Sequence, residues 1–414
     1  MLQCMMKVLD TTETPAFELH FLGQKDDTMM NILRQRGLAR AIVMTATLAS
    51  AGMAAAQDAP PALLPGLSGP LSYNPKPVSF DLAGSKIYVT GIASGYLGAQ
   101  SNSTPGVASS FADVSNAQVI IQKPEGLFQF LVQAGLYSHE TLGLGYARAT
   151  TYTDATYGPV PQAWIKLAPS SSFNVQAGIL PTLIGLEAPF SFQNMNIERG
   201  VLWGQENVLT RGVQTNATLG KVTASVALTD GFFSGKFNWL SGIVSYADGP
   251  HTVSLVLGGA LTRNARSTFS TPLVQNNSTI FNLIYSYSGN KWLVQPYFQY
   301  ARVGALPFLG TTKADNWGVG LLAKYKIDDN WSLPMRLEYV DSNAPTATAA
   351  SFLYGPGSNA FTVTITPTYT FDRFFIRPEV SLVQVSGAAP GAAFGALGQN
   401  KSQVRGRLEF GVMF

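Results

Sequence analysis

Beyond Asp81, the chain is dominated by a strict alternation of apolar and polar residues. The clearest stretch is 361–371, where six apolar positions alternate with five threonines. Successive side chains of a β-strand point to opposite faces, so each such strand has one apolar and one polar face. The pattern predicts an all-β fold whose strands separate an apolar environment from a polar one.

Soluble sandwiches share this period, and composition distinguishes them from barrels that cross a membrane. Charged residues make up 12% of the chain, against about 25% in a typical soluble domain. No run of 18 or more apolar residues could span a bilayer as a helix. A barrel can instead line its interior with charges and present an apolar band to lipid. The last strand fits this arrangement, with Arg405, Arg407 and Glu409 on one face and Leu408 and Phe410 on the other.

Connections between the alternating segments are of two kinds, which is typical of outer-membrane barrels. Short polar turns are expected at Lys123-Pro124-Glu125-Gly126, Pro169-Ser170-Ser171, Gly220-Lys221, Asp248-Gly249-Pro250, Gly289-Asn290, Asp328-Asp329-Asn330 and Asp372-Arg373. Longer loops, such as 138–160, 186–210, 262–279, 341–360 and 386–402, alternate with them. Seven hairpins plus one strand at each end give about sixteen strands, with fourteen to eighteen left open. We predict a transmembrane antiparallel up-and-down β-barrel over 85–414, with short periplasmic turns, long external loops and a location in the cell outer membrane.

Two residue types near the turns bear on this barrel. Aromatic residues beside the turns, including Tyr287, Trp292, Tyr325, Trp331, Phe371 and Phe374, predict a periplasmic girdle at headgroup level. Four prolines within strands, Pro296, Pro334, Pro367 and Pro378, count against a continuous ladder because each lacks a donor. Bulges near the barrel rim are expected to absorb them.

The first 84 residues have three expected parts. Residues 30–56 show a basic start, a weakly polar run and a small-residue end, which predicts a signal peptide cleaved between Ala56 and Gln57. Acidic residues in 1–29 do not fit the start of such a signal, and indicate an over-extended start. Residues 57–84 are rich in proline and predict an extended periplasmic tail.

Several classes of function are disfavoured by what the chain lacks. The one cysteine, Cys4, precedes the cleavage site, so the mature chain has no thiol for a disulfide or a metal. A net charge of only +3 gives no reason to expect a nucleic-acid partner. No metal or cofactor is expected either. The pair His139 and Glu140 could supply a base and its orienting acid, but a solvated loop pair is the simpler interpretation. We therefore expect no enzyme activity.

A resemblance to a known family rests on the stretch Gly178-Ile179-Leu180-Pro181-Thr182-Leu183-Ile184-Gly185-Leu186-Glu187. This stretch resembles a strand of the β-barrel porins of the OmpL-like type. Residues 194–200, Arg211-Gly212-Val213 and Thr229-Asp230-Gly231-Phe232 extend the likeness. The resemblance implies an outer-membrane porin, a channel for passive diffusion of small hydrophilic solutes or ions. The alternative is a barrel that acts as adhesin or receptor through its external loops.

The loop 186–210 is the best functional candidate, because it follows the motif strand and carries several charges. Folded inward, it would narrow the lumen and set opposing charges across it, whereas an ordinary exposed loop is the alternative. The candidate constriction residues are Glu187, Glu198, Arg199, Glu206 and Arg211.

Parity along the strands places ten further charged residues on the lumen wall: Lys166, Lys324, Lys326, Arg336, Glu338, Arg377, Glu379, Arg405, Arg407 and Glu409. Seven of the ten are basic, which predicts a weak anion preference. Alternatively, these charges only keep the interior wet.

The end of the chain predicts how the barrel is assembled. Phe414 ends the last strand in phase with Phe410 on the lipid-facing side. In barrels that it resembles, a C-terminal aromatic residue is read by the insertion machinery, so Phe414 is a candidate assembly signal. Outer-membrane lipids, this machinery and small hydrophilic solutes are the expected partners, and a homo-oligomer remains open.

Overall fold

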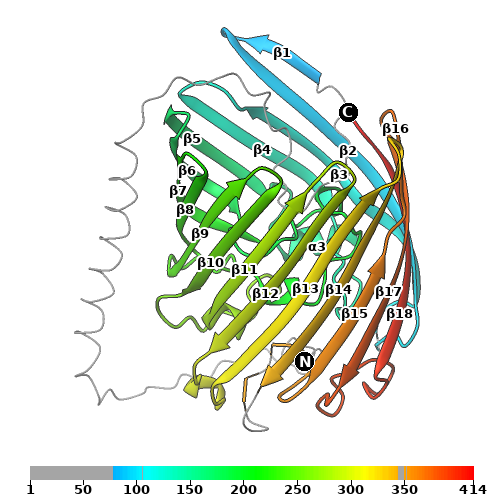
Figure 1. Cartoon of the computed structure of the whole chain (residues 1–414). Helices are drawn as coiled ribbons and strands as arrows, with labels where there is room; N and C mark the ends of the chain where they lie inside the picture. The colour runs from blue at the N-terminus through cyan, green and yellow to red at the C-terminus, as the bar shows by residue number, and fades with distance from the viewer. Residues whose placement is uncertain (1–77, 105, 344–348, 351) are drawn as a thin grey trace, which may run out of the picture. The chain divides into compact units, whose positions relative to one another are not determined.

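The computed structural model describes residues 78–104, 106–343, 349–350 and 352–414. Consecutive strands pair antiparallel from β2 onward, and β18 pairs with β2, which closes the sheet into a barrel (Figure 1). Because β15 and β16 are two halves of one strand that both pair with β14 and β17, the wall has sixteen strands, as the sequence predicts. The strands are β1 Val78–Leu82, β2 Ser85–Gln100, β3 Ser110–Lys123, β4 Phe128–Tyr137, β5 Gln162–Ser170, β6 Phe173–Pro181, β7 Leu209–Leu219, β8 Val222–Thr229, β9 Trp239–Asp248, β10 His251–Ala260, β11 Ser278–Ser288, β12 Trp292–Val303, β13 Ala314–Lys326, β14 Trp331–Asn343, β15 Asn359–Ile365, β16 Thr368–Phe371, β17 Phe374–Ser386 and β18 Ser402–Met413.

Within the described residues, helical structure is confined to the long loops. It consists of α3 Ala149–Ala155 and the single 3-10 turns η2 Ser191–Gln193, η3 Trp203–Gln205, η4 Gln275–Asn277 and η5 Pro307–Leu309. Among the described residues, none of these helices is long and apolar enough to cross a bilayer.

Burial along the strands follows the predicted alternation. Strand β17 alternates exposed and buried positions over its whole length, with Arg377 and Glu379 buried and Val380 61% exposed. The exposed positions of neighbouring strands are also largely aliphatic or aromatic. The barrel therefore has an apolar outer face and a polar interior, which is the reverse of a soluble fold.

The two ends of the barrel differ as the connections predict. All seven short turns join consecutive strands at one end, which is uppermost in Figure 1. Trp292 and Tyr325 pack at 4.7 Å between ring centroids beside these turns, and Trp331 and Tyr369 pack at 4.9 Å. The long connections lie at the other end or, as described below, inside the barrel.

The last residue of the chain extends the seam between β18 and β2. Phe414 exchanges two backbone hydrogen bonds with Gly91 in β2, at 2.8 and 3.0 Å between nitrogen and oxygen. Its ring covers Gly91 so closely that a Cβ atom there would lie 2.1 Å from Phe414 Cζ. Glycine at position 91 lets the C-terminal ring lie directly on the outer face of β2.

The tail predicted at 57–84 ends in a strand instead of an extended segment. Strand β1 pairs with the first residues of β2 through a two-residue turn at Ala83 and Gly84, both with positive φ. Such a turn matches the twist of a hairpin. Of the four prolines, Pro367 separates β15 from β16, and no register shift occurs at Pro296, Pro334 or Pro378. The expected start region, the signal peptide and the cleavage site at Ala56 and Gln57 lie outside the described residues.

Candidate functional site

The connection 182–208 between β6 and β7, here called the inner loop, folds into the barrel and reaches the opposite wall. Near its start, the Gly185 amide donates to Asn282 Oδ1 on β11 at 3.2 Å. Further along, its residues bind β14, which is the eighth strand after β6 in the ring of sixteen and thus faces it across the interior. The inner loop therefore crosses the barrel, as the sequence hypothesis of an inward loop required.

Two wall carboxylates hold the backbone of the inner loop. Glu338 on β14 accepts hydrogen bonds from the amides of Val201 and Leu202 at 2.9 and 3.2 Å. Glu379 on β17 accepts from the amides of Ile197 and Glu198 at 2.6 and 2.9 Å. Each carboxylate satisfies two donors that would otherwise be buried without a partner, which fixes the path of the loop.

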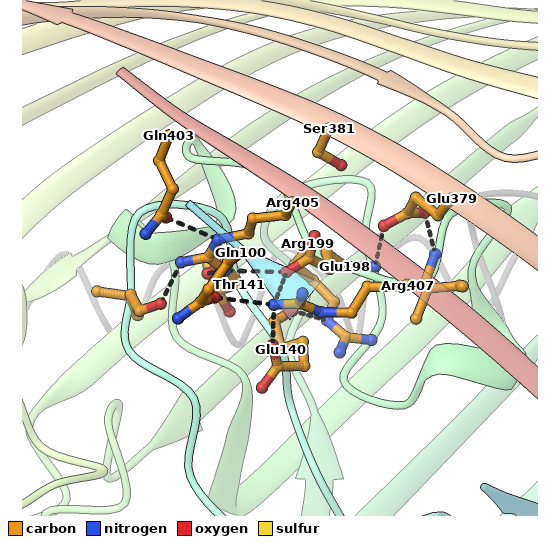
Figure 2. A network of polar contacts seen from close by, with 12 residues as sticks. Gln100, Glu140, Thr141, Glu198, Arg199, Glu379, Ser381, Gln403, Arg405 and Arg407 are labelled. Carbon is orange, nitrogen blue, oxygen red and sulfur yellow. Dashed lines mark hydrogen bonds and ion pairs between the residues drawn. The ribbon is translucent and has the colours of Figure 1, made fainter. Parts of the chain in front are cut away.

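Wall arginines bind the side chains of the same loop. Arg336 Nη1 lies 2.6 Å from Glu187 Oε1. Glu198 Oε1 lies between Arg405 Nη1 at 2.9 Å and Arg407 Nη2 at 3.1 Å, as Figure 2 shows. All five side chains are buried. Removing one partner from such a pair leaves an uncompensated charge and costs about 3–5 kcal/mol.

Close approach of the loop to the wall depends on a small residue at its middle. The amide of Gly200 donates to Glu187 Oε2 at 2.7 Å. A Cβ atom at Gly200 would lie 2.0 Å from Glu338 Oε1. The glycine therefore lets the loop backbone lie directly on the carboxylates that bind it.

A second loop, 138–161, follows β4 and contacts the inner loop. Arg199 and Thr141 form a parallel bridge, in which the Arg199 amide donates to Glu140 O at 2.8 Å. The Glu140 side chain pairs with Arg407 at 3.0 Å. Farther along, the Thr153 side chain in α3 bonds the backbone of Tyr137 at the end of β4. The alternation of side chains along strands could not predict that Glu140 binds a wall arginine, because Glu140 lies in a loop.

The two remaining constriction candidates lie apart from the ion-paired group. No described cation pairs with Glu206, which accepts a hydrogen bond from Gln299 Nε2 at 2.6 Å. Burial, followed by the nearby charge of Glu187, raises the pKa of this loop carboxyl well above its usual range. Arg211 pairs with Asp230 at 2.7 Å and is partly exposed, so it holds the next loop instead of the inner one.

The other predicted wall residues fall into two groups. Arg377 and Glu409 are buried and bonded at 2.7 Å between Nε and Oε2, and Arg377 also donates to Asn194 O in the inner loop at 3.0 Å. The three lysines lie toward the turn end. Lys166 is half-buried beside Trp164, Lys324 is half-buried, and Lys326 is exposed and bonded to Asp329 in the turn.

The pair His139 and Glu140 is not a solvated loop pair. Both side chains are 5% exposed, Glu140 is occupied by Arg407, and His139 lies among aromatic rings. The idea of a surface base with its orienting acid therefore has no support from the geometry. Among the described residues, no group of side chains could hold a metal ion.

A closed sixteen-stranded barrel with an apolar outer face, a charged interior and an inward loop defines the class of outer-membrane channel proteins. The family described as "Putative beta-barrel porin-2, OmpL-like" matches residues 86–414. The chain belongs to this family and is an outer-membrane protein. Among curated protein sequences, none matches significantly.

Solved structures show the same fold at low sequence identity. OmpT of Vibrio cholerae aligns with a TM-score of 0.55 at 11% identity, covering 81% of this chain and 100% of that one. The outer membrane channel DcaP of Acinetobacter baumannii gives 0.54, and OmpF of Salmonella typhi in complex with daunomycin gives 0.53, both with the same identity and coverage. A trimer form of the same OmpT gives 0.52 at 11% identity, covering 79% and 99%.

Proposed function

We propose that this protein is a channel for passive diffusion of small hydrophilic solutes or ions, with a lumen that the inner loop narrows. The observation that carries the proposal is the attachment of the inner loop to the wall opposite its origin, through Glu338, Glu379 and the ion pairs of Glu187 and Glu198. Sixteen strands enclose an interior wide enough for water. A loop fixed across that interior limits the size of solute that can pass.

The constriction in this proposal consists of Glu187, Glu198 and Arg199 from the inner loop, with Glu206 nearer β12. Facing them on the wall are Arg336, Glu338, Arg377, Glu379, Arg405, Arg407 and Glu409. Arg211 does not belong to it, because its ion pair with Asp230 occupies it elsewhere.

Charge pairing changes the expected selectivity. Counting wall residues alone gave a basic excess, but Glu140, Glu187 and Glu198 come from loops and neutralise wall arginines. Each of the four wall arginines has a carboxylate within 3.0 Å. This pairing offsets much of the basic excess behind the predicted weak anion preference, and we expect selectivity by charge to be small.

The expected partners follow from the two faces of the wall. The exposed aliphatic residues of the outer face, such as Ile165 at 70% and Leu257 at 64% exposure, suit outer-membrane lipids. Assembly through the barrel-insertion machinery is expected for such a strand pattern. A homo-oligomer is supported by the trimer form of the structurally similar OmpT.

Single-channel recording tests the proposed function. Protein purified from outer membranes should insert into planar bilayers and produce discrete ion-conducting steps. The steps should be smaller than a sixteen-stranded barrel without an inner loop would give. Absence of steps over many verified insertions would contradict the proposal and favour an adhesin or receptor that acts through external loops.

A further inference from the structure

An aromatic cluster surrounds His139 where the two inward loops meet. The His139 ring lies 4.9–6.1 Å, between centroids, from five other rings. They belong to Tyr137, Tyr152, Tyr157, Phe190 and Trp203. Residues of the loop 138–161 and of the inner loop contribute to the cluster together with the end of β4.

Several hydrogen-bonding atoms inside this cluster have no partner among the residues that the structure describes. They are Arg199 Nη1, Trp203 Nε1 and the ring nitrogens of His139, and each of the three residues is at most 5% exposed. Burial, followed by the charge of Arg199, lowers the pKa of His139, so its ring is neutral and offers one N–H. Buried donors are normally satisfied, and several unsatisfied ones in one place indicate a missing acceptor.

Arg199 also differs from the other buried arginines in its charge balance. In the part of the chain that the structure describes, Arg336, Arg377, Arg405 and Arg407 each form an ion pair, whereas no ion pair includes Arg199. Its guanidinium lies 5.9 Å from the centre of the Trp203 ring. Its Nε donates to Glu140 O at 3.1 Å, whereas Nη1 has no acceptor and no described carboxylate lies within ion-pair distance, so an anion is the favoured partner for Nη1.

We propose that this aromatic cluster is a binding subsite for a small aromatic carboxylate that passes through the channel. The carboxylate accepts hydrogen bonds from Arg199 and Trp203, and the flat ring packs among the aromatic side chains. This inference rests on the proposed channel function and adds the chemical class of a preferred solute. A cation is disfavoured by the charge of Arg199, and a small aliphatic acid would leave the rings without a partner.

Access to the subsite lies toward the outer loops. Tyr152 in α3 is half-buried and contacts Phe269, which is 53% exposed, at 5.5 Å between centroids. Tyr152 lies in the loop 138–161 and Phe269 in the connection between β10 and β11. In this proposal, a ligand ring enters by displacing Tyr152 from His139. Ring contacts from Phe269 to Tyr152 and from Tyr152 to His139 link an exposed residue to the buried centre of the cluster.

The test compares block of the channel current by benzoate, acetate and benzyl alcohol. Benzoate should block saturably at concentrations where the other two have no effect. Arg199→Gln should weaken the block about tenfold, and Trp203→Phe, which keeps a ring but removes the donor, about threefold. Arg263→Gln, in an exposed loop, and Trp317→Phe, on the outer face, are matched controls and should behave as the wild type.

Each outcome decides the proposal. Equal block by acetate would show that the rings do not contribute, and equal block by benzyl alcohol would show that the donors do not require an anion. Unchanged block in both variants would overturn the subsite while leaving the conducting channel intact. If no current is seen, the proposed function fails, and quenching of tryptophan fluorescence by benzoate still tests the subsite, with Trp203→Phe as the variant that should lose it.

Discussion

At the scale of single residues, buried charges determine how the interior is organised. Arg405 and Arg407 share the carboxylate of Glu198, and Arg407 also pairs with Glu140, so loop carboxylates neutralise both buried arginines. The alternation of side chains along β18 predicted that both arginines point into the barrel. It could not predict Glu198 as their partner, because a loop residue has no fixed phase relative to a strand. The sequence therefore indicated which wall residues are internal but not what neutralises them.

Replacing Glu198 with glutamine tests this neutralisation. The variant leaves Arg405 and Arg407 with one carboxylate fewer and weakens the attachment of the inner loop by about 3–5 kcal/mol. We expect the reversal potential in a salt gradient to shift toward anions and the open-channel current to become noisier. Glu125→Gln, in an exposed turn at the other end of the barrel, is the control. Identical reversal potentials in the two variants would contradict the assigned pairing.

A second prediction at this scale concerns Phe414 and the seam. Deleting Phe414 removes the ring over Gly91 and the two backbone hydrogen bonds that end the β18 register. We expect less heat-modifiable barrel in the outer membrane and more unfolded precursor in the periplasm. Phe371→Ala, which removes an exposed ring at the same end of the barrel, should assemble normally. Insertion of the truncated protein at the wild-type level would refute the role in assembly.

At the scale of elements, strands and loops differ in how far their sequence determines them. The alternation of apolar and polar residues predicted all seven short turns and which strand residues face inward or outward. Because side chains alternate with a period of two, the orientation of every residue in a strand is fixed once one face contacts lipid. The tail up to residue 84 was assigned no strand, although Val78–Leu82 forms one. The inward path of the inner loop was only one of two alternatives. Its choice depends on contacts with strands more than 130 residues away, such as Leu202 with Glu338.

Cross-linking the inner loop to the wall tests its path directly. Asn196 Nδ2 donates to Thr366 Oγ1 at 2.7 Å, which brings the loop next to the wall between β15 and β16. Residues 57–414 contain no cysteine, so Asn196→Cys with Thr366→Cys creates one unique pair in that part of the chain. Oxidation or a short thiol cross-linker should join them and leave the conductance unchanged, because the loop already lies there. Failure to cross-link in the folded barrel would place the loop elsewhere.

At the scale of the whole molecule, the fold follows from one physical requirement. Every backbone polar group in the bilayer must be paired, and a closed barrel achieves this with strands that are only half apolar. The low charge content and the absence of an apolar run already indicated this solution. What the sequence could not determine is how much of the enclosed space remains open, since that depends on the loops that fold inside.

The mature chain should begin after Ala56. The small residues before Gln57 favour cleavage there, and the barrel itself starts later, so removing the leader leaves the wall complete. Edman sequencing of protein from outer membranes should give Gln57 as the first residue, within one or two positions. A mature terminus upstream of residue 29 would disprove both the signal peptide and the expected over-extended start.

The inner loop is the element proposed to narrow the channel, and single-channel conductance after deletion of residues 190–206 tests this role most directly. The hydrogen-bonded wall does not include these residues, so the variant should remain heat-modifiable and folded. We predict a conductance several-fold above that of the wild type, because the deleted segment carries the contacts with Glu338, Glu379 and Arg405. An unchanged conductance in a correctly folded barrel would show that the inner loop does not limit the passage of ions.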